Sequence, residues 1–339
     1  MKDNLESDQE GLVPSGKREL STDKSNLYHR GLGLLGNLKK KTCTINFPRD
    51  YSIGKLFIYD EDPHPAYRKM LVQELEAQGE ISIPEGKYIE LYITWDYPYC
   101  LSPISQLKPN DLDSLMINHG QVNDFELIHV SRLTKLRNLS LVCCYAITES
   151  GFLKLQVLKS LEKLSVYGSL MGDEGLDHLH LLSSLQDLTI TNARVSNHGL
   201  KSLKKLPSLQ KFWISNVIAP FPGSDEKLIK LNQLTNTIND AGLFSLSQLT
   251  NLEELSLVGI KISDAGLPHL LKMDSLRSLE LTDTEVSNAG LEYLVKLKNL
   301  KYLYLYLTSV TEAGIAILKN ALPNCSIYHS KRLTHEDSA

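Results

Sequence analysis

The stretch that decides the fold is "NLKYLYLYLTSVTEAGIAIL", residues 299–318. Leu300, Leu303 and Leu305 follow the spacing L-x-x-L-x-L, and tyrosines occupy the alternate positions of 302–306. Alternation with a period of two describes a β-strand with two different faces. The spacing therefore predicts a strand whose leucines enter a core while its tyrosines point to the opposite side.

The same leucine spacing recurs along most of the chain. Copies of the pattern, two of them weaker, begin at residues 88, 112, 136, 161, 185, 209, 252, 276 and 300. The steps between them are 24 or 25 residues, apart from one step of 43 between 209 and 252. Such a regular period predicts a repeat protein, in which each unit buries its leucines only by stacking on its neighbours.

A second pattern follows the strands in phase. The segments "SDAGLPHLLKM" (263–273) and "SNAGLEYLVKL" (287–297) begin with a serine and continue with leucines spaced for a helix. Serine is a preferred helix N-cap, so each unit reads as strand, turn and short helix of two or three turns. Gly266 and Gly290 are expected to let the helix backbone approach its neighbour closely.

This pattern resembles the leucine-rich repeat family, over about residues 88–328. The 24-residue form is similar to repeats of bacterial proteins and of F-box-associated leucine-rich repeat proteins. The resemblance implies an α/β solenoid that is curved, with a parallel sheet on its concave face and short helices on its convex face. It specifies the fold and leaves the function open, because fold does not determine function.

Composition shifts divide the chain into four segments. Residues 1–45 are polar and lack periodicity, which predicts a disordered tail. Residues 46–87 are expected to form an α/β N-terminal cap, in which "PAYRKMLVQELEAQ" (65–78) reads as an amphipathic helix. Repeats fill 88–328, about ten in number, and 329–339 form a C-terminal tail whose preceding residues close the sheet.

The long step of 43 residues has two interpretations. Either a loop is inserted, or a further repeat starts at Leu228 after a unit that has lost its helix in "VIAPFPGSDEK", residues 217–227. The prolines and glycine of that stretch forbid a helix. The second interpretation is favoured, with an irregular solenoid near 217–235.

The third, fifth and seventh residues of each repeat are expected on the concave face, where a partner would bind. Exposed Trp and Tyr side chains favour protein binding because they bury a large area at low entropic cost. The residues predicted to bind a partner are Tyr92, Met116, Tyr167, Trp213, Glu280, Tyr302, Tyr304 and Tyr306. For the last three, shielding of the sheet end is an equally good explanation.

Composition excludes several classes. The net charge of −4 offers no basic field for nucleic acid, and no apolar run is long enough for a membrane span. Five cysteines without metal-type spacing indicate a reducing, cytoplasmic setting. Cys144 occupies a structural position of the repeat, so the pair Cys143–Cys144 is read as structural rather than redox-active. His178 and His180 do not share a helix face, and they make a poor metal pair.

Three functions follow from these observations. The favoured one is a non-enzymatic scaffold that binds a protein or peptide on its concave face, without cofactor or metal. The second is the substrate-recognition subunit of a ubiquitin ligase-type complex, which the resemblance to F-box-associated repeats suggests. The third is an enzyme with a site in the cap or beside residues 217–227. The oligomeric state is left open.

Overall fold

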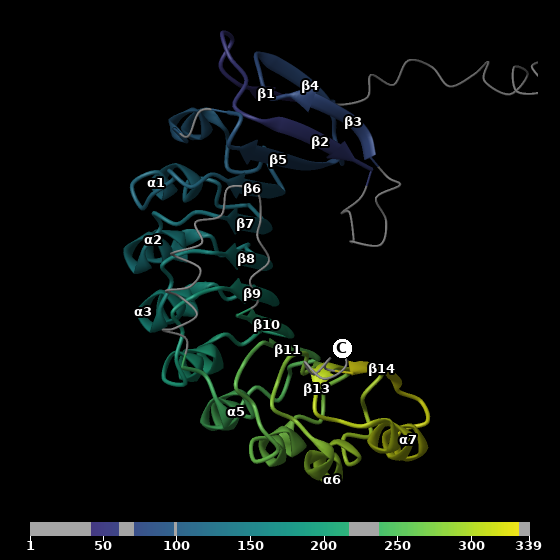
Figure 1. Ribbon diagram of the computed structural model, residues 1–339. Helices are drawn as coiled ribbons and strands as arrows, with labels where there is room; N and C mark the ends of the chain where they lie inside the picture. Colours follow the sequence, from purple (N-terminus) through teal and green to yellow (C-terminus); the bar gives the residue numbers. More distant parts are fainter. Residues whose placement is uncertain (1–41, 61–70, 98–99, 217–236, 332–339) are drawn as a thin grey trace, which may run out of the picture. The chain divides into compact units, whose positions relative to one another are not determined.

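Strands that stack in sequence order dominate the computed structural model (Figure 1). The structure describes residues 42–60, 71–97, 100–216 and 237–331. The chain divides at Lys41 and Thr42 into two units, and the described residues all belong to the second. Within that unit the sheet lines the inner side of a curved stack and the helices line the outer side (Figure 1).

The strands are β1 Thr42–Asn46, β2 Lys55–Tyr59, β3 Leu71–Glu76, β4 Glu80–Pro84, β5 Tyr88–Thr94, β6 Ser114–Asn118, β7 Asn138–Val142, β8 Lys163–Tyr167, β9 Asp187–Thr191, β10 Lys211–Ser215, β11 Glu254–Val258, β12 Ser278–Glu280, β13 Tyr302–Thr308 and β14 Ser326–Lys331. The α-helices are α1 Leu127–Val130, α2 Glu149–Lys154, α3 Asp173–Asp177, α5 Asp240–Leu246, α6 Leu291–Leu294 and α7 Glu312–Ala321. The 3₁₀ helices are η2 Ser102–Gln106, η3 Leu155–Val157, η4 His178–Leu181, η5 Gly199–Lys205, η6 Leu267–Lys272 and η7 Asn288–Gly290.

The large sheet confirms the predicted α/β solenoid with leucine-rich repeat architecture. It has 12 strands in the order β14-β13-β12-β11-β10-β9-β8-β7-β6-β5-β2-β3, and all pairs from β5 to β14 are parallel. The leucines of the opening stretch, Leu300, Leu303 and Leu305, are buried. Many helical segments are 3₁₀ rather than α-helical and span only one or two turns, shorter than expected.

A ladder of carboxylates and amides joins successive repeats behind the strands. The Asp264 carboxylate accepts hydrogen bonds from the backbone N–H of Ser287 (2.8 Å) and from its hydroxyl (2.6 Å). Asp240 holds Ser263 in the same way. Gly266 confirms the predicted close approach, because a Cβ there would lie 2.5 Å from Asp240 Oδ1. Ser287 also caps η7, accepting from the N–H of Ala289 at 3.2 Å.

The N-terminal cap differs from the prediction. The segment read as an amphipathic helix contains β3, and β3 pairs antiparallel with β2, while residues 61–70 lie outside the described range. Helix propensity is a weak prior, and hydrogen bonding to the open edge of β2 overrides it here. The cap also begins earlier than residue 46, because β1 starts at Thr42 and pairs with β4 in a separate two-stranded sheet.

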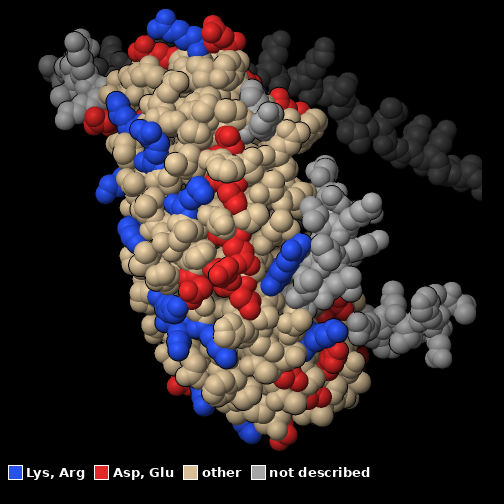
Figure 2. Space-filling model, turned by 90° about the vertical axis from the view of Figure 1, so that its left-hand side faces the viewer, with Lys and Arg blue, Asp and Glu red and all other residues tan. Residues whose placement is uncertain are grey.

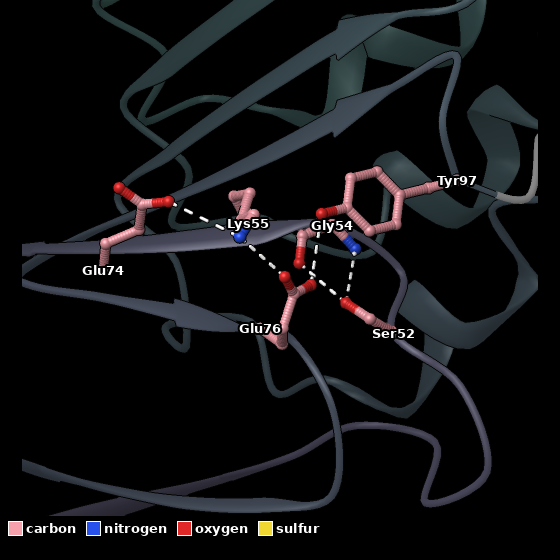
Figure 3. A network of polar contacts seen from close by, with 6 residues as sticks. All are labelled: Ser52, Gly54, Lys55, Glu74, Glu76 and Tyr97. Carbon is pink, nitrogen blue, oxygen red and sulfur yellow. Dashed lines mark hydrogen bonds and ion pairs between the residues drawn. The ribbon is translucent and has the colours of Figure 1, made fainter.

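Polar contacts tie the cap to the first repeat (Figure 3). Lys55 lies 2.6 Å from Glu76 and 3.5 Å from Glu74, both on β3. The Tyr97 hydroxyl, from the turn after β5, donates to Glu76 at 3.1 Å. The hydrogen bond from Lys55 has the largest effect on the pKa of Glu76, which it lowers, and the hydrogen bond from Tyr97 lowers this pKa further. Because these side chains are exposed, the contacts fix geometry more than they add stability.

The pairing of β10 with β11 also differs from the favoured interpretation. β10 and β11 are hydrogen-bonded neighbours, with Lys211 opposite Glu254 and Trp213 opposite Ser256. The predicted repeat strand near Leu228 lies outside the described residues, and no place remains for it between β10 and β11. The described sheet therefore has one strand fewer than the favoured interpretation requires.

At the C-terminal end of the sheet, β14 extends through Lys331, so the sheet includes residues 329–331 that were assigned to the tail.

One residue of β5 lies on the opposite face of the sheet from the one expected. Tyr88 begins the first copy of the leucine pattern, where the spacing predicts a residue that enters the core. It continues the alternation of β5 with Glu90 and Tyr92, and its hydroxyl accepts from the Asn138 amide on the concave side.

Candidate binding face

The parallel register aligns equivalent residues in rows across the concave face. The third residues of the repeats form one row, and the fifth residues form the next. The fifth row reads Tyr92, Met116, Ser140, Ser165, Thr189, Trp213, Ser256, Glu280, Tyr304 and Tyr328.

An open groove of about 480 Å³ lies over β10 to β13 on this face. Trp213 forms one end, and Tyr302 and Tyr304 form the other. Its lining is completed by Glu254, Leu255, Ser256, Ser278 and Glu280. The groove joins four of the eight residues predicted to bind a partner: Trp213, Glu280, Tyr302 and Tyr304.

Trp213 stands on the face with little support around it. Its direct neighbours across the strands are Thr189 on β9 and Ser256 on β11, both small. As a result 44% of the tryptophan remains exposed, although it sits in the middle of a parallel sheet. A large aromatic side chain left in water in this way is typical of a binding anchor.

Glu280 is held firmly at the floor of the groove. One carboxylate oxygen accepts a hydrogen bond from the Ser256 hydroxyl at 2.7 Å, and the other accepts one from the Thr282 hydroxyl at 3.2 Å. The register places Glu280 directly between Ser256 on β11 and Tyr304 on β13. The carboxylate is therefore fixed in position by hydroxyl donors.

Charges in the third row alternate from strand to strand and compensate one another. The row runs Lys163, Asp187, Lys211, Glu254 over β8 to β11, and Lys211 Nζ lies 2.5 Å from Glu254 Oε1. Burial raises the pKa of Asp187, against the opposing effect of the two flanking lysines. The alternation leaves this part of the face with no net charge.

The tyrosines of the opening stretch lie where the sheet ends. The rings of Tyr304 and Tyr328 stack with centroids 4.8 Å apart and planes within 10°. Burial raises the pKa of the Tyr304 hydroxyl, and the neighbouring Tyr328 and Glu280 add to this. Stacking is the packing that end-shielding predicts, while 45% of Tyr302 remains exposed beside the groove. Stacking thus agrees with end-shielding, and the exposure of Tyr302 agrees with partner binding. Tyr306 lies on the same face of β13 as Tyr302 and Tyr304.

The structure keeps the other predicted residues apart from the groove. Tyr92 and Met116 are opposite each other on β5 and β6, and the Tyr92 ring packs on Phe57 of the cap at 4.8 Å. Tyr167 lies on β8 in the seventh row, and burial raises its pKa. The eight residues thus fall into separate groups along the sheet.

Five groove and sheet-end residues were missed by the sequence reasoning: Glu254, Leu255, Ser256, Ser278 and Tyr328. Tyr328 follows Tyr304 by one repeat length of 24 residues, so extending the period by one unit would have found it. Ser256 and Glu254 were assigned to the concave face but not to a site. Only the structure shows that Ser256 and Glu254 line the groove together with Trp213 and Glu280.

Cys144, which the sequence assigns a structural position, lies in the hydrophobic core. Cys144 is buried, its Sγ lies 3.4 Å from the Val142 carbonyl, and burial raises its pKa to about 12. This position matches the structural interpretation of the cysteine pair. No group of three or more His, Cys, Asp or Glu side chains within the described ranges could hold a metal ion. In those same ranges no helix has the length and apolar character needed to cross a membrane.

The helix-covered side has a different charge pattern. Figure 2 shows acidic side chains gathered in a column on the side that carries α1, α2 and α3, with basic side chains beside it. Glu149 on α2 belongs to this side, and burial raises its pKa, helped by the neighbouring carboxylates of Glu174 and Asp173 on α3. These acids repel one another.

Comparison with known proteins adds no family assignment. No protein-family model matches the chain, and no curated protein matches it. Among solved structures, an internalin (inlF) from Listeria monocytogenes is similar with a TM-score of 0.48 at 19% identity, covering 72% of this chain and 67% of that one. An internalin C2 from the same organism gives 0.37 at 19% identity, covering 61% and 84%. The plant peptide hormone receptor RGFR1 in complex with RGF2 gives 0.35 at 14% identity. That match covers 65% of this chain and spans 31% of the receptor. The leucine-rich repeat fold of this protein rests on its own strand register.

Proposed function

We propose that the protein is a non-enzymatic scaffold that captures a protein or peptide partner on the concave face of its solenoid. The observation that carries this proposal is the exposure of Trp213 at the end of an open groove in the middle of the sheet. A groove of about 480 Å³ has the size of an ordinary ligand site, and its open form suits a segment of polypeptide.

The lining of the groove supports a protein partner. Aromatic side chains at both ends offer rigid apolar contact, and serines and carboxylates between them offer hydrogen-bonding groups. This combination of aromatic anchors and a polar surround is characteristic of protein interfaces. The ubiquitin ligase-type role stays a prediction, since no described element distinguishes it from other scaffolds.

The experiment is an affinity pull-down from native host cells with identification by mass spectrometry. Wild-type protein is compared with Trp213→Ala/Tyr304→Ala, after circular dichroism has shown that both are folded. A matched control, Phe125→Ala/Phe244→Ala, removes two exposed aromatic side chains from the helix-covered side instead. We expect a partner that wild type and control capture and the groove variant loses.

The opposite result would move the site elsewhere. A partner retained by the groove variant and lost by the Phe125→Ala/Phe244→Ala control would place binding on the helix side. A partner retained by all three proteins would refute a role for the exposed aromatic side chains of both faces.

A further inference from the structure

The fifth row of the concave face carries a single charge along the parallel strands β5 to β14. Apart from Glu280, its members are hydroxyl, aromatic and methionine side chains. The adjacent third row is balanced over β8 to β11 by its alternating lysines and acids, and the residues of the seventh row are uncharged. Among the described residues of β8 to β13 on this face, Glu280 is therefore the charge that no neighbouring row compensates.

No cationic side chain of the described residues pairs with Glu280. The ion pairs found there join other residues, including Lys211 with Glu254 beside it in the groove. Among the residues that the structure describes, the Glu280 carboxylate accepts hydrogen bonds from the hydroxyls of Ser256 and Thr282. Each carboxylate oxygen has a second lone pair, so the group retains the capacity to accept from a ligand.

Aromatic rings flank this carboxylate in a direct line across the sheet. The register runs Trp213, Ser256, Glu280, Tyr304 over four neighbouring strands. Strands lie about 4.8 Å apart, so a cation bound at Glu280 would be within about 6 Å of the Tyr304 ring, where cation–π attraction acts. Ser256 lies between Glu280 and Trp213 in this line and is itself buried.

We propose that Glu280 recognises an arginine side chain on the partner, with Tyr304 and Trp213 as the flanking aromatic surfaces. This inference rests on the proposed function and names the chemistry of the partner that the groove takes. A guanidinium group is planar, donates two parallel hydrogen bonds to a carboxylate and stacks on aromatic rings. A lysine ammonium matches the charge but not the planar, two-point geometry.

The test selects peptides from a random displayed library on full-length protein. Four proteins are used: wild type, Glu280→Gln, Trp213→Ala and the control Glu285→Gln. Glu285 is exposed in the same repeat and lies outside the groove lining, so its substitution makes the same change in net charge. We expect peptides from wild type and control to be enriched in arginine at one position, and Glu280→Gln to lose that enrichment.

A synthetic peptide from the selection then gives the magnitude. Its arginine is replaced by citrulline, a neutral side chain of nearly the same shape, and binding is measured by fluorescence anisotropy. Loss of one charge-assisted contact predicts about tenfold weaker binding to wild type. The same replacement is expected to change binding to Glu280→Gln by less than about twofold, because the two changes remove the same interaction.

The outcomes separate this inference from the proposed function. Equal arginine enrichment from Glu280→Gln, or enrichment of lysine over arginine from wild type, would overturn the inference. Peptides without basic residues that bind wild type and not Trp213→Ala would overturn it while supporting the binding face. Peptides that bind Trp213→Ala as well as wild type would count against both. If wild type selects no peptide, the arginine proposal fails, and the pull-down alone decides the proposed function.

Discussion

Replacing Asp264 tests whether the carboxylate ladder stabilises the stack of repeats. Its carboxylate accepts two hydrogen bonds from Ser287 in the next repeat, one from the backbone N–H at 2.8 Å and one from the hydroxyl at 2.6 Å. Asp264→Ala removes both bonds and leaves the Ser287 N–H, which is partly buried, without its acceptor. A hydrogen bond to a charged group contributes about 1.5–3 kcal/mol, and the partial exposure of this pair lowers that contribution. We expect Asp264→Ala to lower the free energy of unfolding by about 2–3 kcal/mol.

The protein contains a natural control for the same position. In the following repeat Asn288 takes the place of Asp264; its Oδ1 accepts from the Thr311 N–H at 3.0 Å and its Nδ2 donates to the Thr311 hydroxyl at 2.9 Å. An amide therefore satisfies the same two groups. We expect Asp264→Asn to cost only about 0.5–1 kcal/mol, because neutral hydrogen bonds replace charge-assisted ones. Both variants change the net charge equally, so their difference reports the hydrogen bonds.

The assay is equilibrium unfolding in urea followed by circular dichroism. The slope of the transition is compared between variants, since repeat proteins can unfold in parts. Hydrogen exchange at the Ser287 amide gives a local measurement, and Asp264→Ala is expected to accelerate it more than Asp264→Asn does. Equal losses for the two variants, or a loss below about 0.5 kcal/mol for Asp264→Ala, would refute the reasoning.

Three further predictions concern close packing, thiol reactivity and pH. Gly290→Ala is expected to cost about 1–3 kcal/mol of unfolding free energy, because the added Cβ would collide with the carboxylate and a leucine of the preceding repeat. Gly120→Ala, where the nearest atom would be 3.5 Å away, is expected to stay within about 0.5 kcal/mol in the same urea assay. Cys100 is exposed and should react with a thiol reagent in the native protein, whereas the buried Cys144, with a pKa of about 12, should react only after unfolding; labelling followed by mass spectrometry distinguishes them. Burial and neighbouring acids raise the pKa of Glu149, so its ionised form costs stability at neutral pH and that cost disappears as the pH falls through the raised pKa. Glu149→Gln should therefore raise the melting temperature at pH 7 and have little effect near pH 3, and the reverse order would contradict this account.

The sequence by itself determined the repeat architecture. A leucine spacing with a step of 24 or 25 residues fixes which residues enter the core and which lie on the concave face, because both follow from local strand geometry. The burial of Leu300, Leu303 and Leu305 and the parallel pairing of β5 to β14 confirm it. The candidate residues on the concave face could be named for the same reason.

Only the tertiary structure decided the rest, because it depends on contacts between distant segments. Leu71–Glu76 is a strand because the edge of β2 was available to pair with it, and its own sequence favoured a helix. The direct pairing of β10 with β11 brought Trp213 beside the serine and glutamates of later repeats. The groove exists because that pairing spans the 43-residue step, which periodicity could not resolve.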